Sequence, residues 1–417
     1  MRFLRLIAAA APLAAGAAAM DTPQPGSIYR EYRIANRGDT WRVTDPAARH
    51  EGSKQYLPNP KLKLEITDLQ GAARAEAVIA RWGGHPGTSK KRLRVNGRPW
   101  IDIPEIATVT GPLRPECVMY QDNPVVPVPL EDLREGENIF EGTCSDQICY
   151  GFGWGQWGWD AVIVRVYYSD AKPHPTGRIT GPTRGATIED NPKLAAVAEG
   201  AAGIARVDFL AYYEGHDEDG DGVFRDWHHA YQFNRRSPDG GQYPEISGHA
   251  GTARAAPFEV EWNTRWVADQ TGIQIVARIQ DKAGVWFVTE PVRDLALSRT
   301  KYAVRFYKPS GVPERYWVRA KRSASSVVAI PETEPLDRAI QAVVHLRTWN
   351  GESENFSVNG SAAPIGGGNH VFADTSPGVA VDALNKGENK MDFRSETAHH
   401  GVEVCWPGPS LTVRYVK

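Results

Sequence analysis

The stretches VPLEDLREGEN (residues 128–138) and VAVDALNKGEN (residues 379–389) match in register without a gap. Each follows a Val-Asn-Gly segment, at residues 95–97 and 358–360. A pattern that recurs at this length and wide separation indicates two copies of one structural unit. We therefore predict two related domains, one toward each end of the 417-residue chain.

The recurring elements are typical of β-structure. An apolar strand precedes each Asn-Gly, and these two residues tolerate the positive φ angles of tight hairpin turns. In Leu-x-x-Gly-Glu-Asn, the glycine permits a sharp bend, and we expect the leucine to anchor it in the core. Final strands follow at residues 164–166 and 413–415. Each copy is thus predicted to be a β-sandwich.

These turns resemble those of the galactose-binding-like jelly roll, as in the sugar-binding domain of family 2 glycoside hydrolases. The resemblance rests on the "NG" turn and the "L-x-x-G-x-N" turn, and it covers residues 55–170 and 300–417. It implies a jelly-roll sandwich for both regions. Because the motifs are structural turns, they imply a fold rather than a ligand.

Residues 178–298 have a different pattern, with alternating strands at 258–262 and 273–279 and an Asp-Lys-Ala-Gly turn at 281–284. This succession is similar to bacterial immunoglobulin-like (Ig-like) modules, which are seven-stranded sandwiches. Only residues 193–201 suggest a helix. We predict an all-β chain of three β-sandwich domains in series: jelly roll, Ig-like and jelly roll.

The N-terminus has a basic start followed by a short alanine-rich apolar run, which is typical of a secretory signal peptide at residues 1–19. Residues 20–54 are then an N-terminal extension. No stretch reaches the ~20 apolar residues of a membrane span. We expect secretion to the extracellular space or cell surface, or to the periplasm in a bacterium.

Charge and cysteine content limit which binding partners and which cellular compartment are expected for this protein. Lys and Arg number 48 against 50 Asp and Glu, a net charge of −2, which argues against a nucleic-acid partner. Cys117, Cys144 and Cys149 lie close together, whereas Cys405 is remote. In an exported chain this predicts one local disulfide, which we expect to involve Cys144, with its partner left open.

An acidic segment, DEDGDG at residues 217–222, places carboxylates at alternate positions and a glycine at the sixth. Oxygen ligands at this spacing can surround calcium, although His228 stands where an EF-hand has its glutamate. We predict a structural calcium site, and the alternative is an acidic, solvated turn. The expected ligands are Asp217, Asp219, Asp221, the carbonyl of Val223, and Asp226.

Aromatic residues separated by glycines occupy residues 150–160, just before the last strand of the first copy. Flat rings on an exposed loop stack against sugar rings, and nearby polar groups bond hydroxyls. The alternative is that the rings seal the sandwich or pack on its neighbour. The counterpart at residues 399–409 keeps one Trp and is expected to be structural. The predicted carbohydrate-binding residues are Tyr150, Trp154, Trp157, Trp159 and Asp160.

These features favour a secreted, non-catalytic protein that binds a polysaccharide. One alternative is a polysaccharide hydrolase or lyase, with its site in a cleft between the Ig-like domain and a jelly roll. A second alternative is a structural or adhesive protein, and the oligomeric state stays open. The sequence contains no nucleophile elbow, phosphate loop or dinucleotide fingerprint. Catalytic candidates for the enzyme alternative are His216, Asp226, His228 and His229.

Overall fold

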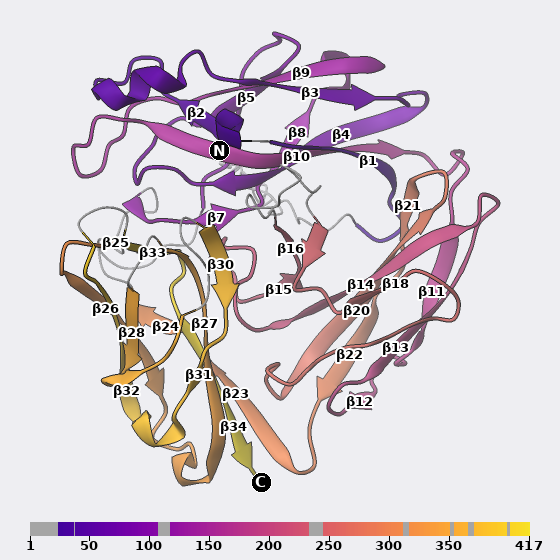
Figure 1. Ribbon diagram of the computed structural model, residues 1–417. Helices are drawn as coiled ribbons and strands as arrows, with labels where there is room; N and C mark the ends of the chain where they lie inside the picture. Colours follow the sequence, from indigo (N-terminus) through magenta and orange to yellow (C-terminus); the bar gives the residue numbers. More distant parts are fainter. Residues whose placement is uncertain are drawn as a thin grey trace, which may run out of the picture.

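The computed structural model describes residues 24–36, 38–106, 117–232, 245–311, 317–350, 354–365, 371–397 and 401–417. The predicted signal peptide at residues 1–19 lies outside this part of the chain. The described chain is nearly all β, which confirms the predicted fold class (Figure 1). Its helices are short 3-10 turns: η1 (Gly38–Trp41), η2 (Glu51–Tyr56), η4 (Leu130–Asp132), η5 (Leu336–Arg338) and η6 (Val381–Ala383).

The first sandwich packs strands β1, β10, β4 and β7, with β2 and β8 at their sides, against the four-stranded sheet β3-β9-β5-β6. Its core lies between these sheets and includes Trp157, Trp159 and Phe140. The strands are β1 (Ile28–Ala35), β2 (Arg42–Thr44), β3 (Lys61–Ile66), β4 (Ala72–Trp82), β5 (Arg92–Val95), β6 (Ile101–Asp102), β7 (Gln121–Asp122), β8 (Val125–Val128), β9 (Gly136–Thr143) and β10 (Gln156–Tyr168).

The central sandwich packs a sheet built on β14, β20 and β22 against the three-stranded sheet β11-β13-β19. A separate apolar core, including Phe209 and Trp262, fills the space between them. The strands are β11 (Thr176–Gly181), β12 (Thr187–Ile188), β13 (Lys193–Glu199), β14 (Ile204–Glu214), β15 (Arg225–His228), β16 (Ala230–Gln232), β17 (Glu245–Ser247), β18 (Gly251–Ala253), β19 (Phe258–Glu261), β20 (Gln270–Asp281), β21 (Val285–Val288) and β22 (Val292–Leu297).

The third sandwich packs the sheet β23-β34-β27-β33-β25, with β30 and β31 beside β27, against the sheet β24-β26-β32-β28-β29. Phe356, Phe393 and Tyr415 belong to its core. The strands are β23 (Tyr302–Tyr307), β24 (Pro309–Gly311), β25 (Trp317–Val318), β26 (Ser323–Ile330), β27 (Ala339–Asn350), β28 (Glu354–Val358), β29 (Ser361–Ala362), β30 (Val371–Thr375), β31 (Gly378–Val379), β32 (Gly387–Ser395), β33 (Val402–Val404) and β34 (Ser410–Val416).

The repeated sequence folds into the same hydrogen-bonded turn in both flanking sandwiches. Asn96 donates from Nδ2 to Oδ1 of Asn138 at 2.9 Å, and Asn359 donates to Asn389 at the same distance. Each buried asparagine, Asn138 or Asn389, also donates to two backbone carbonyls and accepts one backbone N–H. Asn96 and Asn359 adopt φ angles of 51° and 49°, as expected for an Asn-Gly turn.

The N-terminal segment is part of the fold, because the stretch predicted as an extension at residues 20–54 includes strands β1 and β2. Strand β1 pairs along its full length with β10, and on its other side Ile28, Tyr29 and Arg30 pair with β21. A single 13-stranded sheet therefore runs through the first and central sandwiches. Apolar side chains of β1, such as the fully buried Tyr29, complete the packing between them.

Two further predictions need correction. Most of the segment considered for a helix, residues 193–201, forms strand β13 (Lys193–Glu199), because Leu194 and Ala196 alternate into the central core. The disulfide joins Cys117 to Cys149, and Cys144 is a buried free thiol. Cys144 lies just after strand β9 and points into the core of the first sandwich, which keeps it away from the other two cysteines.

Candidate functional site

A pocket of about 420 Å³ opens between the first and third sandwiches. Both sandwiches supply aromatic and polar side chains to it, so neither forms the site alone. The lining residues are His85, Pro86, Met119, Gln147, Tyr150, Gly151 and Phe152 from the first sandwich, and Trp317, Arg319, Trp349 and Glu403 from the third.

The third sandwich presents a tryptophan, a carboxyl and a second tryptophan in a row. Glu403 on β33 is the register partner of Trp317 on β25 and of Trp349 on β27. Directly paired residues of adjacent strands project from the same face of a sheet, with Cβ atoms about 5 Å apart. Their neighbours Val318, Val402 and Val404 point the other way, into the core. The row therefore forms one wall of the pocket.

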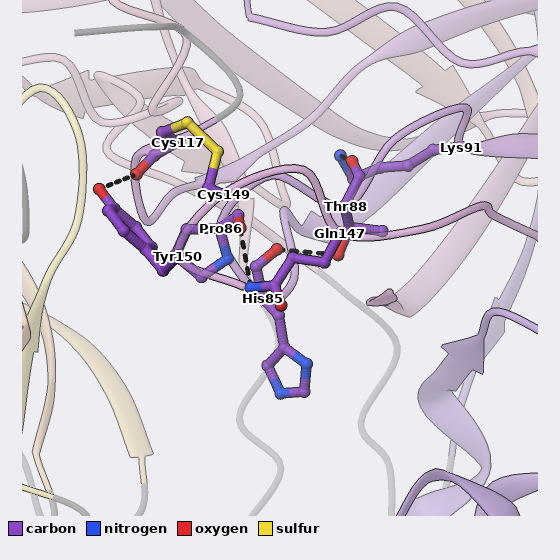
Figure 2. Close-up of a disulfide and its surroundings, with 8 residues drawn as sticks. All are labelled: His85, Pro86, Thr88, Lys91, Cys117, Gln147, Cys149 and Tyr150. Atoms are coloured by element: carbon purple, nitrogen blue, oxygen red, sulfur yellow. Dashed lines mark hydrogen bonds between the residues drawn. A yellow bond between two sulfur atoms is a disulfide. The ribbon is translucent and has the colours of Figure 1, made fainter. Parts of the chain in front are cut away.

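The disulfide holds the opposite wall. Figure 2 shows Cys149 tied to Cys117, with the hydroxyl of Tyr150 donating to the Cys117 carbonyl at 3.3 Å. The side-chain amide of Gln147 donates to the Pro86 carbonyl at 2.9 Å (Figure 2). Tyr150 then meets the ring of Trp317 edge-on, with centroids 5.5 Å apart. The disulfide loop thus places an aromatic ring directly against the third sandwich.

Glycines allow the first-sandwich segments to approach one another closely. Gly87 has φ +88°, and a Cβ there would lie 2.4 Å from the sulfur of Cys149. A Cβ on Gly84, at φ +100°, would lie 1.9 Å from the carbonyl oxygen of Gln156. Only glycine fits these positions. The result is that His85, between them, sits at the pocket rather than in a surface loop.

Burial shifts the pKa values of two pocket residues, Glu403 and His85, toward their uncharged forms. It raises the pKa of Glu403 to about 7, although the Arg319 guanidinium acts in the opposite direction. It lowers the pKa of His85 to about 4, against the effect of the hydrogen bond between Nδ1 and the Trp154 carbonyl, 2.8 Å away. Since a carbonyl only accepts, Nδ1 carries the proton and Nε2 is a hydrogen-bond acceptor. The lining thus combines two groups whose uncharged forms are favoured by burial with the guanidinium of Arg319.

The predicted aromatic loop divides into a pocket part and a core part. Tyr150 lines the pocket, and Phe152, at 44% the most exposed aromatic side chain of the described residues, lies beside it. Trp154 is partly buried and stacks on His50 with ring centroids 4.9 Å apart. The rings of His85, Phe152 and Trp154 contact one another and form one aromatic cluster.

Trp157, Trp159 and Asp160 are buried, so the prediction that they contact a saccharide is wrong. They belong to strand β10, which begins at Gln156, and both indoles point into the first core. Gly158 between them is not a loop glycine, because a Cβ there would lie 2.1 Å from the ring of Trp41. The glycine leaves room for that ring, and this close packing gives the spacing that resembles a loop.

The acidic segment lies where the three sandwiches meet. Asp217 accepts backbone N–H groups from Gly220 and Gly222, each at 2.7 Å. Asp221 accepts from the N–H of Val223, also at 2.7 Å. Among the residues that the structure describes, no group of three His, Cys, Asp or Glu side chains is arranged to hold a metal ion. Asp217 and Asp221 thus stabilise the turns of their own loop by accepting backbone hydrogen bonds.

The same loop contacts both flanking sandwiches. Arg347 donates to the carbonyls of Gln121 at 3.2 Å and Glu218 at 2.5 Å, and it pairs with Asp374. Beside the pocket, the backbone N–H of Trp406 donates to the Met119 carbonyl at 2.6 Å. These contacts fix the third sandwich against the first.

The histidines proposed for the enzyme alternative are hydrogen-bonding groups, of which His228 and His229 are buried and His216 is partly buried. Nε2 of His228 lies 3.0 Å from the Tyr213 carbonyl, and its ring stacks on that tyrosine at 3.7 Å. Nδ1 of His229 lies 2.8 Å from the Trp227 carbonyl. His216 lies 3.0 Å from the hydroxyl of Ser410 on β34. Asp226 accepts the N–H of Trp227. This part of the chain does not line the pocket.

Sequence reasoning missed the third-sandwich wall and His85. The segment expected to be structural contains Glu403, and its two tryptophan partners lie 86 and 54 positions earlier (403 − 317 and 403 − 349). Strand pairing brings these residues together, and no local sequence motif predicts that they are neighbours. The one available signal is Gly84 to Gly87, where two glycines flank a histidine and a proline.

No family model and no curated protein matches this sequence. Solved structures with a partial likeness include a β-porphyranase of glycoside hydrolase family 86 from the human gut bacterium Bacteroides plebeius. It is 11% identical with a TM-score of 0.24, and the match covers 60% of this chain and 38% of that one. The fibronectin(III)-like modules of Clostridium thermocellum CbhA are 15% identical with a TM-score of 0.19, covering 57% of this chain and 86% of theirs. At these scores the likenesses assign neither a family nor an activity.

Proposed function

We propose that this protein binds carbohydrate in the pocket between its first and third sandwiches. The observation that carries the proposal is the row of Trp317, Glu403 and Trp349 facing Tyr150 and Phe152 across the pocket. Aromatic faces stack on the apolar faces of sugar rings, and polar groups between them bond the hydroxyls. The pocket residues, rather than the weak likeness to the porphyranase, support this function.

Affinity electrophoresis of the purified chain in gels containing a panel of polysaccharides tests the proposal. We expect retardation by at least one polymer, and a loss of about tenfold in affinity for Trp317→Ala or Trp349→Ala, equivalent to about 1.4 kcal/mol. Trp100→Ala is the matched control, since Trp100 packs beside Arg94, outside the pocket lining. Thermal unfolding checks that each variant is folded. Absence of retardation by every polymer would reject the proposal and favour the structural or adhesive alternative.

Cleavage of a polysaccharide is the second candidate, and one observation favours it. The pocket lining includes both a carboxyl with a pKa near 7, Glu403, and a neutral imidazole, His85. Environments that shift the pKa values of two titratable groups in opposite directions are typical of catalytic acid and base pairs. Release of reducing or unsaturated sugar ends that disappears in Glu403→Gln would establish cleavage. Retardation in the gel without release of sugar ends would support binding and reject cleavage.

Export to an oxidising compartment is part of the proposal. The Cys117–Cys149 disulfide supports it, because such bonds persist mainly in secreted and periplasmic proteins. Within the described residues, no helix has the length and apolar character to cross a membrane. The jelly-roll and Ig-like identities of the sandwiches also remain inferences from their sequence motifs.

Calcium at the acidic loop stays a separate proposal. Asp217 and Asp221 already satisfy backbone N–H groups, so calcium would have to use their remaining lone pairs together with Asp219, Asp226 and the Val223 carbonyl. If calcium binds there, it should raise the melting temperature relative to EDTA, and Asp221→Asn should remove that increase. An unchanged melting temperature would reject the site.

A further inference from the structure

Arg319 combines exposure with a fixed position at the pocket. It follows β25 and lies two residues after Trp317, so both side chains lie on the side opposite the buried Val318. Its guanidinium carbon is 6.0 Å from the centroid of the Trp317 ring. Within the described chain, it forms no salt bridge with a carboxylate. The pocket thus has an exposed cation beside an aromatic face.

The backbone around Arg319 is built closely against the next strand. Gly401 has φ +76°, and a Cβ there would lie 2.0 Å from the Val318 carbonyl and 2.7 Å from the Cβ of Arg319. After Arg319, Ala320 and Lys321 both adopt positive φ angles, 56° and 63°. Non-glycine residues adopt this conformation rarely, and only where their surroundings require it. The position of Arg319 is therefore set by the fold.

At mildly acidic pH, the other ionisable groups of the lining are mostly uncharged and leave this cation without a counter-charge. Burial favours the uncharged forms of both Glu403 and His85. The remaining lining residues are aromatic, apolar or amide side chains and one glycine. A neutral sugar would use the rings and leave the guanidinium without a partner, whereas an anionic group would pair with its planar set of donors.

We propose that the pocket selects acidic saccharides, with a carboxylate or sulfate group held by Arg319 while a sugar ring stacks on Trp317. This inference rests on the proposed carbohydrate binding and deepens it, because it names the class of glycan. The chemistry recognised is an anion attached to a sugar ring, which either a uronic acid or a sulfated sugar supplies.

Matched pairs of polymers separate charge from sugar type. We would measure affinity electrophoresis at pH 6 with polygalacturonate against its fully methyl-esterified form, and with dextran sulfate against dextran. We expect at least one acidic polymer to bind about tenfold more tightly than its neutral partner, consistent with a charge-assisted hydrogen bond. The carboxylated and sulfated arms show which anion is preferred.

Two variants distinguish a specific contact from general charge. Arg319→Gln should remove the preference for the acidic polymer, whereas Arg322→Gln should change affinity less than about twofold. Arg322 is exposed on the same turn but lies outside the pocket lining, so its loss changes the net charge equally. Equal effects of the two variants would overturn the role of Arg319.

The two proposals fail differently. If neutral polymers bind as tightly as acidic ones and Arg319→Gln is silent, the acidic class is wrong and carbohydrate binding stands. If none of the polymers in the wider panel binds, carbohydrate binding itself is rejected. Binding of the acidic polymers alone, abolished by Arg319→Gln, supports both.

Discussion

The two flanking sandwiches share their Asn-Gly turns but differ in the segment that precedes their last strand. In both, a buried asparagine bonds the turn asparagine and the same kind of backbone groups. The first sandwich then has a disulfide loop followed directly by β10, whereas the third inserts β33 before β34. The turns maintain the fold, and the divergent segments meet at the pocket. The comparison shows that a duplicated scaffold can form one site from two unlike edges.

The largest expected effect tests which aromatics of the first segment belong to the scaffold. Trp157→Ala should destabilise the chain by about 4 kcal/mol, because it leaves a large cavity in the first core. Denaturant unfolding measures this loss. A cost below about 1 kcal/mol would mean that residues 156–160 behave as a surface loop, as the glycine spacing first suggested.

The shared turns should respond alike. Asn138→Ala and Asn389→Ala should each cost about 3 kcal/mol, since each removes several buried hydrogen bonds and leaves backbone groups unsatisfied. The same unfolding measurement applies to both. Their exposed neighbours Glu137 and Glu388 serve as matched controls and should cost less than about 0.5 kcal/mol when changed to Ala. A clearly smaller cost in one copy would show that the turns are not equivalent in energy.

The acidic loop between the two copies predicts a dependence of stability on pH. Burial raises the pKa of Asp217 to about 6, of Glu218 to about 7 and of Asp221 to about 8. The folded state therefore holds these protons more tightly than the unfolded state. Their contribution is most favourable below the unfolded pKa of about 4 and is lost as pH rises toward about 8.

The size of that loss should be on the order of 1–3 kcal/mol after allowance for solvent screening. Unfolding curves between pH 5 and pH 8 measure it, and Asp221→Asn is the comparison chain. We expect the variant to lose less stability over this range than the parent. An identical slope in both chains would show that Asp221 is not the group responsible.

The smallest expected effect on stability belongs to the exposed part of the aromatic segment. Phe152→Ala should change the free energy of unfolding by less than about 0.5 kcal/mol, because the ring is 44% exposed. Its affinity for a retarding polysaccharide should nevertheless fall, since the ring borders the pocket. Unchanged affinity would place the binding surface entirely on the third sandwich and Tyr150.

The sequence predicted the all-β class and the repeated turn from local chemistry. Asn-Gly and Leu-x-x-Gly-Glu-Asn specify backbone conformations within a few residues, so their meaning survives without tertiary information. The presence of one local disulfide could also be predicted from the cysteine content and the expected export. The pairing could not be predicted, because Cys144 and Cys149 are only five positions apart (149 − 144) in the sequence. Cys144 directly follows strand β9 and lies in the core, and this leaves Cys149 to pair with Cys117.

The sequence by itself thus determined the all-β class, the repeated turns and the presence of a segment rich in aromatics. Tertiary structure alone decided which rings became core and which became surface, since Trp41 covering Gly158 turns a loop-like pattern into a buried strand. It also decided the site. Trp317, Trp349 and Glu403 become neighbours through strand pairing, and they face Tyr150 only because two sandwiches pack together. Local patterns encode backbone conformation, whereas a pocket between domains depends on contacts that no single segment contains.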